Sequence, residues 1–223
     1  MKFLLLVFLL ASAHAQRSGL DYSSDEIRRL QASDAENPGM LWVDRGQQLF
    51  AKECASCHAS MAGTAAKYPR RENGKAVTLA ERIRHQKPDL AWESENFLAL
   101  LAWVASQSRG QPMNNLSEKS VERGKAEYFR RRGQMNLACT HCHDDNAGKK
   151  LGAETVSEGQ PNGYPAYRLE WQKLGSLQRR LRACMFGVHA EIPDYASELL
   201  NELELYLAFR AKGLPIEAPA VRR

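Results

Sequence analysis

The sequence lacks a hydrophobic run long enough to cross a bilayer, because the apolar stretch Phe3 to Ala11 falls well short of the roughly 20 residues required. It also lacks a strong excess of one charge, with 31 basic residues against 26 acidic ones and no basic tract interleaved with aromatics. These two absences exclude a membrane span and a nucleic-acid-binding function. No segment alternates apolar and polar residues over the length of a strand, so we expect an all-α fold.

The first 15 residues have the composition of a secretory signal. Lys2 is followed by the apolar run and then by the small-residue pattern Ala13-His14-Ala15. A membrane anchor is the alternative, but the apolar run is too short for one. We therefore expect residues 1–15 to be removed and the mature chain to begin near Gln16.

Cysteine is scarce, and four of the five cysteines lie in two copies of one motif, CASCH and CTHCH. Two thiols one helical turn apart can form thioethers to the two vinyl groups of one haem, and the histidine that follows becomes its proximal iron ligand. A zinc site or a pair of disulfides does not explain the histidine in both copies. The motifs predict two covalently bound c-type haems, held by Cys54, Cys57, Cys139 and Cys142 and ligated by His58 and His143.

The segments before the two motifs also repeat. Both Gly46 to His58 and Gly124 to His143 start with glycine, continue through a short helical pattern with aromatics and end in the haem motif. Ser106 to Ser120, between the repeats, is rich in Ser, Gly, Pro and Asn, which is typical of a linker. The pattern predicts two tandem cytochrome c-like domains, residues 16–113 and 114–223, with the boundary near Asn114.

A helix is predicted near the C-terminus, where DYASELLNELELYLAFRAKG has apolar residues at helical spacing. Asp194, which follows Pro193, is the expected N-cap, and Gly213 is the expected C-cap.

The fifth cysteine, Cys184, lies outside both motifs. Leu177, Leu181 and Cys184 are spaced i, i+4 and i+7, so the thiol falls on an apolar helix face that is expected to meet a haem. Arg180 precedes it by one turn, and a neighbouring cation favours the thiolate, the form that ligates metal and attacks sulfur. The alternative is a small buried apolar residue, which free cysteines often are.

Three stretches carry a family resemblance: RRGQMNLACTHCHDDNAGKKLG, YPAYRLEWQKLGSLQRRLRACMFGVHAE and ELELYLAFRAKGL. They resemble SoxA, the catalytic subunit of the SoxAX cytochrome that starts periplasmic thiosulfate oxidation. The likeness is dense from about Arg131 to Leu214. It implies that Cys184 is the distal ligand of the C-terminal haem, often carried as a persulfide, and that Arg180 belongs to the substrate pocket.

The resemblance also implies a reaction and partners. Thiosulfate is joined to a cysteine of the SoxYZ carrier protein, and two electrons pass to haem and on to a downstream electron-accepting cytochrome. A small monohaem partner, SoxX, is expected to form a heterodimer with this chain, and the periplasm is the expected location. Two alternatives remain, a thiosulfate dehydrogenase that forms tetrathionate and a plain dihaem electron-transfer cytochrome.

The chain departs from the family at two positions. Two-haem members usually carry a cysteine as distal ligand of the N-terminal haem after an ERI-like stretch, whereas this chain reads ERIRHQKPDLAW. His85 is the expected substitute ligand, with Met113 as the alternative. His189, in GVHAE, stands where the family more usually has a pocket-lining arginine.

Overall fold

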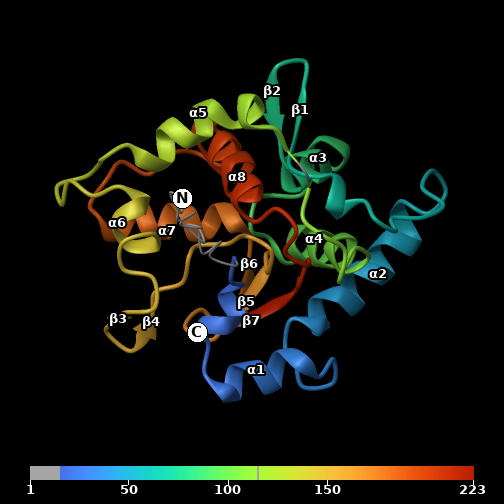
Figure 1. The fold of residues 1–223 in the computed structure, drawn as a ribbon. Helices are drawn as coiled ribbons and strands as arrows, with labels where there is room; N and C mark the ends of the chain where they lie inside the picture. The colour runs from blue at the N-terminus through green and yellow to red at the C-terminus, as the bar shows by residue number, and fades with distance from the viewer. Residues whose placement is uncertain (1–15, 115) are drawn as a thin grey trace, which may run out of the picture.

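The computed structural model describes residues 16–114 and 116–223, and over these residues helices make up most of the regular secondary structure (Figure 1). The predicted signal peptide, residues 1–15, lies outside them. None of the described helices is long and apolar enough to cross a membrane. Single turns of 3-10 helix lie at Gly19–Tyr22 and Ala65–Lys67. The α-helices are α1 (Asp25–Ala32), α2 (Met40–Glu53), α3 (Leu79–Gln86), α4 (Glu95–Ser106), α5 (Glu118–Phe129), α6 (Cys139–His143), α7 (Leu177–Gly187) and α8 (Glu198–Arg210).

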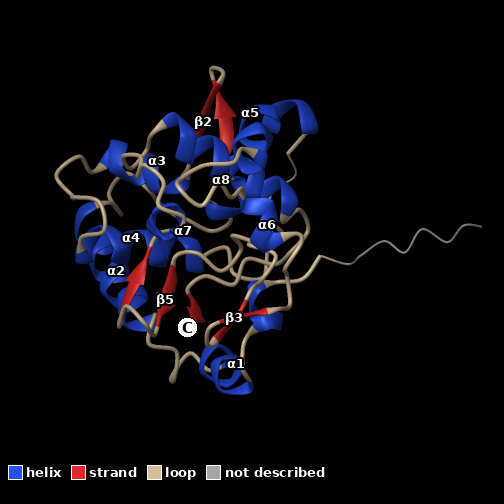
Figure 2. Ribbon diagram, turned by 90° about the vertical axis from the view of Figure 1, so that its left-hand side faces the viewer, coloured by secondary structure: helices blue, strands red, loops and turns tan. Residues whose placement is uncertain are grey.

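Short strands lie between the helices, and they correct the expected all-α fold, of which the helical part is confirmed (Figure 2). Each has only two or three residues, too few for an alternating pattern to appear in the sequence. They form two hairpins, β1-β2 and β3-β4, and one three-stranded sheet in the order β6-β5-β7. Their bounds are β1 (Arg70–Glu72), β2 (Lys75–Val77), β3 (Lys150–Leu151), β4 (Glu154–Thr155), β5 (Ala166–Arg168), β6 (Lys173–Gly175) and β7 (Ala220–Arg222).

Two helix pairs, α2 with α4 and α5 with α8, pack in the same way. In the first pair Gly46 lies so close to α4 that an added Cβ would stand 2.1 Å from the carbonyl oxygen of Ala99. In the second pair the corresponding distance from Gly124 to the carbonyl oxygen of Glu202 is 2.0 Å. A side chain at either position would force the helices apart, so both positions require glycine. The two sequence repeats therefore produce the same helix packing twice.

The repeat extends to α3 and α7. Each helix follows an antiparallel strand pair, β1-β2 or β5-β6, and begins at a hydroxyl cap. The Thr78 Oγ1 accepts a hydrogen bond from the Glu81 N–H at 3.0 Å, and the Ser176 Oγ accepts one from the Arg179 N–H at 3.2 Å. Thr78 and Ser176 are thus equivalent positions, and the residues that follow them can be compared one for one.

The start of α8 differs from the expected N-cap at Asp194. The helix is capped by Ser197, whose hydroxyl accepts a hydrogen bond from the Leu200 N–H at 3.4 Å. Ala196 has φ +57°, which lies outside the helical region and prevents a helix from continuing back to Asp194.

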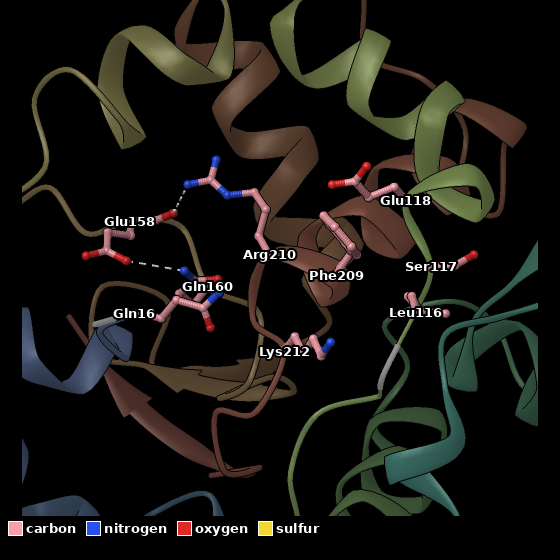
Figure 3. A pocket seen from close by; sticks show the side chains of 9 residues that line it. All are labelled: Gln16, Leu116, Ser117, Glu118, Glu158, Gln160, Phe209, Arg210 and Lys212. Carbon is pink, nitrogen blue, oxygen red and sulfur yellow. Dashed lines mark hydrogen bonds between the residues drawn. The ribbon is translucent and has the colours of Figure 1, made fainter. Parts of the chain in front are cut away.

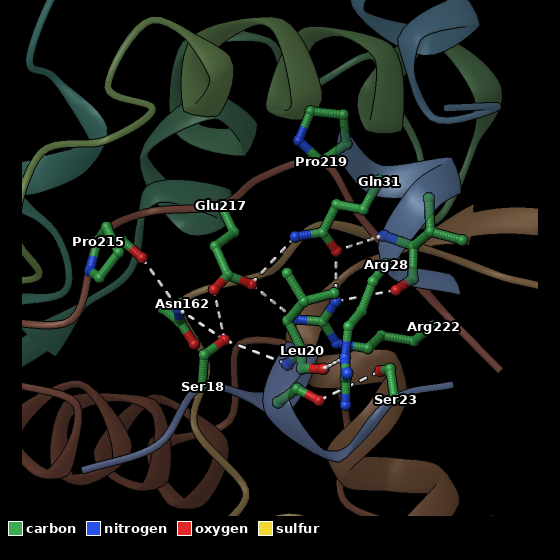
Figure 4. Close-up of polar contacts among 12 residues, drawn as sticks. Ser18, Leu20, Ser23, Arg28, Gln31, Asn162, Pro215, Glu217, Pro219 and Arg222 are labelled. Carbon is green, nitrogen blue, oxygen red and sulfur yellow. Dashed lines mark hydrogen bonds and ion pairs between the residues drawn. The ribbon is translucent and has the colours of Figure 1, made fainter. Parts of the chain in front are cut away.

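The first and last described segments pack together, with α1 against β7 (Figure 4). The carboxylate of Glu217 accepts a hydrogen bond from the Gln31 side chain at 3.3 Å and pairs with Arg222 at 2.8 Å. The hydroxyl of Ser18 contacts the same carboxylate. These contacts hold the N-terminal segment against the C-terminal strand.

A buried ion pair between Arg71 of β1 and Glu202 of α8 joins the two repeats. Two nitrogen–oxygen contacts of 2.5 and 2.6 Å connect the side chains, and the Glu202 side chain is only 3% exposed. The substitution Arg71→Ala leaves that carboxylate paired only with the more exposed Arg123, at 2.9 Å. We expect the free energy of unfolding to fall by about 3 kcal/mol, measured by denaturant titration, because the Glu202 carboxylate stays buried without its main cationic partner.

The matched control for this prediction is Arg70→Ala. Arg70 pairs with Glu72 at 2.7 Å, but its side chain is 42% exposed, so the expected loss is below about 1 kcal/mol. Equal losses in the two variants would contradict a special role for the buried pair.

Candidate functional site

The second cysteine motif forms α6, a single helical turn. Because Cys139 and Cys142 are three residues apart in a helix, their side chains lie on the same face. Both are half-buried, and burial raises the pKa of Cys139 to about 11 and raises the pKa of Cys142 in the same direction. Two adjacent thiols on one turn, followed by an imidazole, are the donor set that holds a c-type haem. The residues present therefore fit that group.

His143 is held in a fixed orientation. Its Nδ1 lies 2.7 Å from the carbonyl oxygen of Ser157, which makes Nδ1 the protonated nitrogen and leaves Nε2 free to bind a metal. Gly159 lies against the ring, and an added Cβ would stand 3.0 Å from its Cγ atom. The loop after β4 therefore supports the histidine from behind.

Cys184 faces His143 from α7. The two side chains lie close enough to shift each other's pKa, so the structure brings together an imidazole and a thiol from segments far apart in the sequence. Burial by itself raises the pKa of Cys184, but the hydrogen bond with His143 and the charge of Arg180 outweigh it and leave that pKa below its usual value. Cys184 thus lies on the side of α7 that faces the second motif, and its predicted contact with a haem stays a prediction.

Two arginines surround the thiol. Arg180 lies one turn before Cys184 on α7; burial alone lowers the pKa of Arg180, but the charges of Cys184, Tyr164, Glu154 and Glu170 together raise it. Arg168 of β5 also lowers the pKa of Cys184, and its side chain is only 5% exposed. It is held 2.8 Å from a carboxylate oxygen of Glu170, and the centre of the Trp171 ring lies 5.1 Å from its guanidinium carbon. Sequence reasoning missed Arg168, because the strand that carries it was not predicted.

The first cysteine motif begins where α2 ends. Cys54 is the C-cap residue of α2, and its carbonyl oxygen accepts hydrogen bonds from the N–H groups of Cys57 and His58 at 3.1 and 3.0 Å. The motif therefore forms one turn, as the second motif does, although Cys57 and His58 are exposed. All five cysteines lie in the described residues and are free thiols.

The structure also shows the surroundings of His85, Met113 and His189, the other residues singled out in the sequence. His85 is exposed on α3. Met113 is half-buried and lines a cavity of about 80 Å³ between the repeats, together with Ile216 and the buried carboxyl group of Glu204. His189 is exposed at φ +55°, and its Nδ1 lies 3.3 Å from the amide oxygen of the Gln134 side chain.

A wide cleft of about 1030 Å³ has Arg210 and Glu158 on its wall (Figure 3). Arg210, on its wall, lies 2.6 Å from a carboxylate oxygen of Asp144, the residue after His143. The Arg210 guanidinium also donates to the carbonyl oxygen of Glu158 at 3.4 Å. Arg210 thus ties α8 to both segments that flank the histidine and its Ser157 partner. The cleft is lined by Gln16, Leu116, Ser117, Glu118, Glu158, Gln160, Phe209, Arg210 and Lys212.

Comparison with known proteins gives consistent matches. A family model for the SoxA/TsdA cytochrome c domain matches residues 41–113 and 123–216. The L-cysteine S-thiosulfotransferase subunit SoxA of Pseudaminobacter salicylatoxidans is 34% identical, over 92% of this chain and 80% of that protein. The corresponding subunit of Paracoccus pantotrophus is also 34% identical, over 92% and 78%. A crystal structure of SoxXA from P. pantotrophus aligns with a TM-score of 0.88 and 33% identity, over 93% of this chain and 87% of that chain.

Proposed function

Because the chain belongs to the SoxA/TsdA cytochrome c domain family, we propose that it joins thiosulfate to a cysteine of a carrier protein, as an L-cysteine S-thiosulfotransferase subunit. The observation that carries this proposal is the position of Cys184 near His143, where the positive charges of Arg180 and Arg168 also lower its pKa. Positive charge around a thiol suits a sulfur-containing anion, whereas a plain electron carrier needs no such arrangement.

A cytochrome c domain carries covalently bound c-type haem, and we place two haems in this chain. One is held by Cys54, Cys57 and His58 in residues 16–113, and the other by Cys139, Cys142 and His143 in residues 114–223. The repeated packing of α2 on α4 and of α5 on α8 supports two units of one design. When bound, haem supplies an acceptor that takes electrons one at a time.

Arg180 and Arg168 bind the substrate in this proposal. Thiosulfate is a dianion, and two guanidinium groups beside Cys184 neutralise it and direct its terminal sulfur toward the thiolate. The lowered pKa of Cys184 favours the thiolate, which is the reactive form of that sulfur. If haem is held by Cys139, Cys142 and His143, Cys184 would be a second iron ligand, and the same sulfur would react with the substrate bound by the arginines.

The bond changes balance in two steps. In the first step the Cys184 thiolate and the terminal sulfur of thiosulfate form a sulfur–sulfur bond, and the two electrons released are taken up, one at a time, by the downstream electron-accepting cytochrome. In the second step the deprotonated cysteine of the carrier attacks the sulfur that bears the sulfonate group, and the Cys184 thiolate is regenerated. The net reaction breaks one S–H bond of the carrier, forms one S–S bond and releases one proton and two electrons.

The proposed partners follow from the same assignment. The aligned crystal structure is of SoxXA, so we propose a SoxX-like monohaem cytochrome as the heterodimer partner. A SoxYZ-like carrier supplies the cysteine, and a downstream cytochrome accepts the electrons. The signal-like segment 1–15 supports a periplasmic location.

The reaction is tested with the haem-loaded chain and its monohaem partner, thiosulfate, a single-cysteine carrier protein and ferricytochrome c as electron acceptor. Mass spectrometry should show one thiosulfate-derived adduct on the carrier cysteine for every two electrons transferred. A carrier whose cysteine is replaced by serine is the control and should remain unmodified.

The other candidate functions give different products in the same assay. Tetrathionate formed at an equal rate without carrier would identify a thiosulfate dehydrogenase. An absence of any thiosulfate-dependent reduction would leave a plain electron-transfer cytochrome. Either result would contradict the proposed function.

A further inference from the structure

The structural repeat defines which residue of α3 corresponds to Cys184. Thr78 and Ser176 cap α3 and α7 at equivalent positions, each after an antiparallel strand pair. Counting from these caps, Gln86 is the equivalent of Cys184. His85, the predicted ligand, is the equivalent of Ala183.

The helix face leads to the same residue. Leu79 and Ile83 pack against the apolar core of the first repeat, at the positions that Leu177 and Leu181 occupy in α7. At about 100° per residue, Gln86 lies within about 20° of Leu79 around the helix axis, whereas His85 lies about 120° away. Gln86, although exposed as His85 is, therefore lies on the side of α3 that carries Leu79 and Ile83.

The end of α3 is also fixed beside the first cysteine motif. Lys87 follows Gln86, and its Nζ lies 2.7 Å from a carboxylate oxygen of Glu53. Glu53 is the last residue of α2 and immediately precedes Cys54. This ion pair holds Gln86 near the turn that contains Cys54, Cys57 and His58.

Met113 occupies a different kind of position. It lies near the bridge between Pro112 and Pro215, where the two repeats meet, and its equivalent beyond that bridge is Ile216. An aliphatic residue at the equivalent position shows that this place in the repeat serves packing. Met113 is therefore not the counterpart of Cys184.

We propose that Gln86, and not His85 or Met113, closes the distal side of the haem on the first motif, opposite His58. This inference rests on the proposed function only in requiring that the first motif carries haem. An amide oxygen is a weak donor in comparison with a thiolate or an imidazole, so the ferric iron there is expected to be largely high-spin and to bind an added small ligand such as cyanide. The two haem sites would then differ in ligand exchange: Cys184 would block added ligands at the C-terminal site, whereas the N-terminal site would bind them.

The test compares two cysteine variants at adjacent positions, Gln86→Cys and His85→Cys, each matured as the full haem-loaded protein. Haem content per chain and low-temperature EPR of the oxidised protein are the readouts. Gln86→Cys should add a second low-spin thiolate signal and should abolish cyanide binding at the first haem. His85→Cys should do neither, and His85→Ala should leave the spectrum unchanged.

Several outcomes would overturn the inference. A thiolate signal from His85→Cys, no new signal from Gln86→Cys, or a changed spectrum in His85→Ala would each do so while two haems per chain are present. A ratio of one haem per chain in the unmodified protein would overturn the two-haem proposal, and this inference with it.

Discussion

Replacing Cys184 with alanine is expected to reduce carrier conjugation by at least about 1,000-fold while both haems remain attached. The substitution removes the sulfur that we assign as nucleophile and iron ligand, and loss of a nucleophile costs at least this much in comparable enzymes. The four motif cysteines are separate side chains, so haem attachment should not change. Thiosulfate-dependent reduction of the acceptor, measured alongside haem content, gives the result.

Two further variants distinguish the loss of the thiolate from a change in side-chain packing on α7. Cys184→Ser keeps the approximate size of the side chain but removes the thiolate, and it should be as inactive as the alanine variant. Ala183→Ser places a hydroxyl at the adjacent position of α7 and should retain most of the activity. Near-normal conjugation by Cys184→Ala would rule out the covalent role.

Replacing Arg180 with methionine should lower kcat/KM for thiosulfate by about 100-fold. Loss of a half-buried cation that binds a dianion removes roughly 2–3 kcal/mol of binding and also raises the pKa of the Cys184 thiol, since Arg180 is one of the groups that lower it. The effect should fall mainly on KM, because the methionine keeps the volume of the side chain but not its charge. Steady-state kinetics over a range of thiosulfate concentrations measure it.

Arg179 provides the matched control on the same helix. Its guanidinium carbon lies 4.2 Å from the centre of the Trp171 ring, and it is not among the groups that affect Cys184 most strongly. Arg179→Met should therefore change kcat/KM only a few-fold through general electrostatic attraction. Equal losses in the two variants would show that net charge, and not a specific contact of Arg180, controls thiosulfate binding.

The sequence contains most of the information that identifies the C-terminal site. Two local patterns carry this information: the motif spacing in Cys139 to His143 and the helical spacing of Leu181 and Cys184. Such patterns can be recognised in the sequence without knowledge of the fold. Arg180 could be found in the same way, because it shares a helix with the thiol.

Other parts of the site depend on tertiary structure. Arg168, which lowers the pKa of Cys184, lies on a three-residue strand, and the carbonyl oxygen of Ser157 contacts His143 from a loop, so no spacing in the sequence relates these residues to the site. His85 is predicted from residue chemistry alone, and it stays a prediction, whereas the proposed Gln86 depends on helix phase. The phase becomes certain only when the caps Thr78 and Ser176 are seen to be equivalent.

The most direct test of the account is low-temperature EPR of the oxidised, periplasmically matured protein, comparing the unmodified chain with Cys184→Ala. The account predicts a low-spin thiolate-type signal that disappears in the variant while the signal of the other haem persists. Identical signals from the two proteins would show that Cys184 is only a packed thiol, and would contradict its role as the sulfur at which iron and substrate meet.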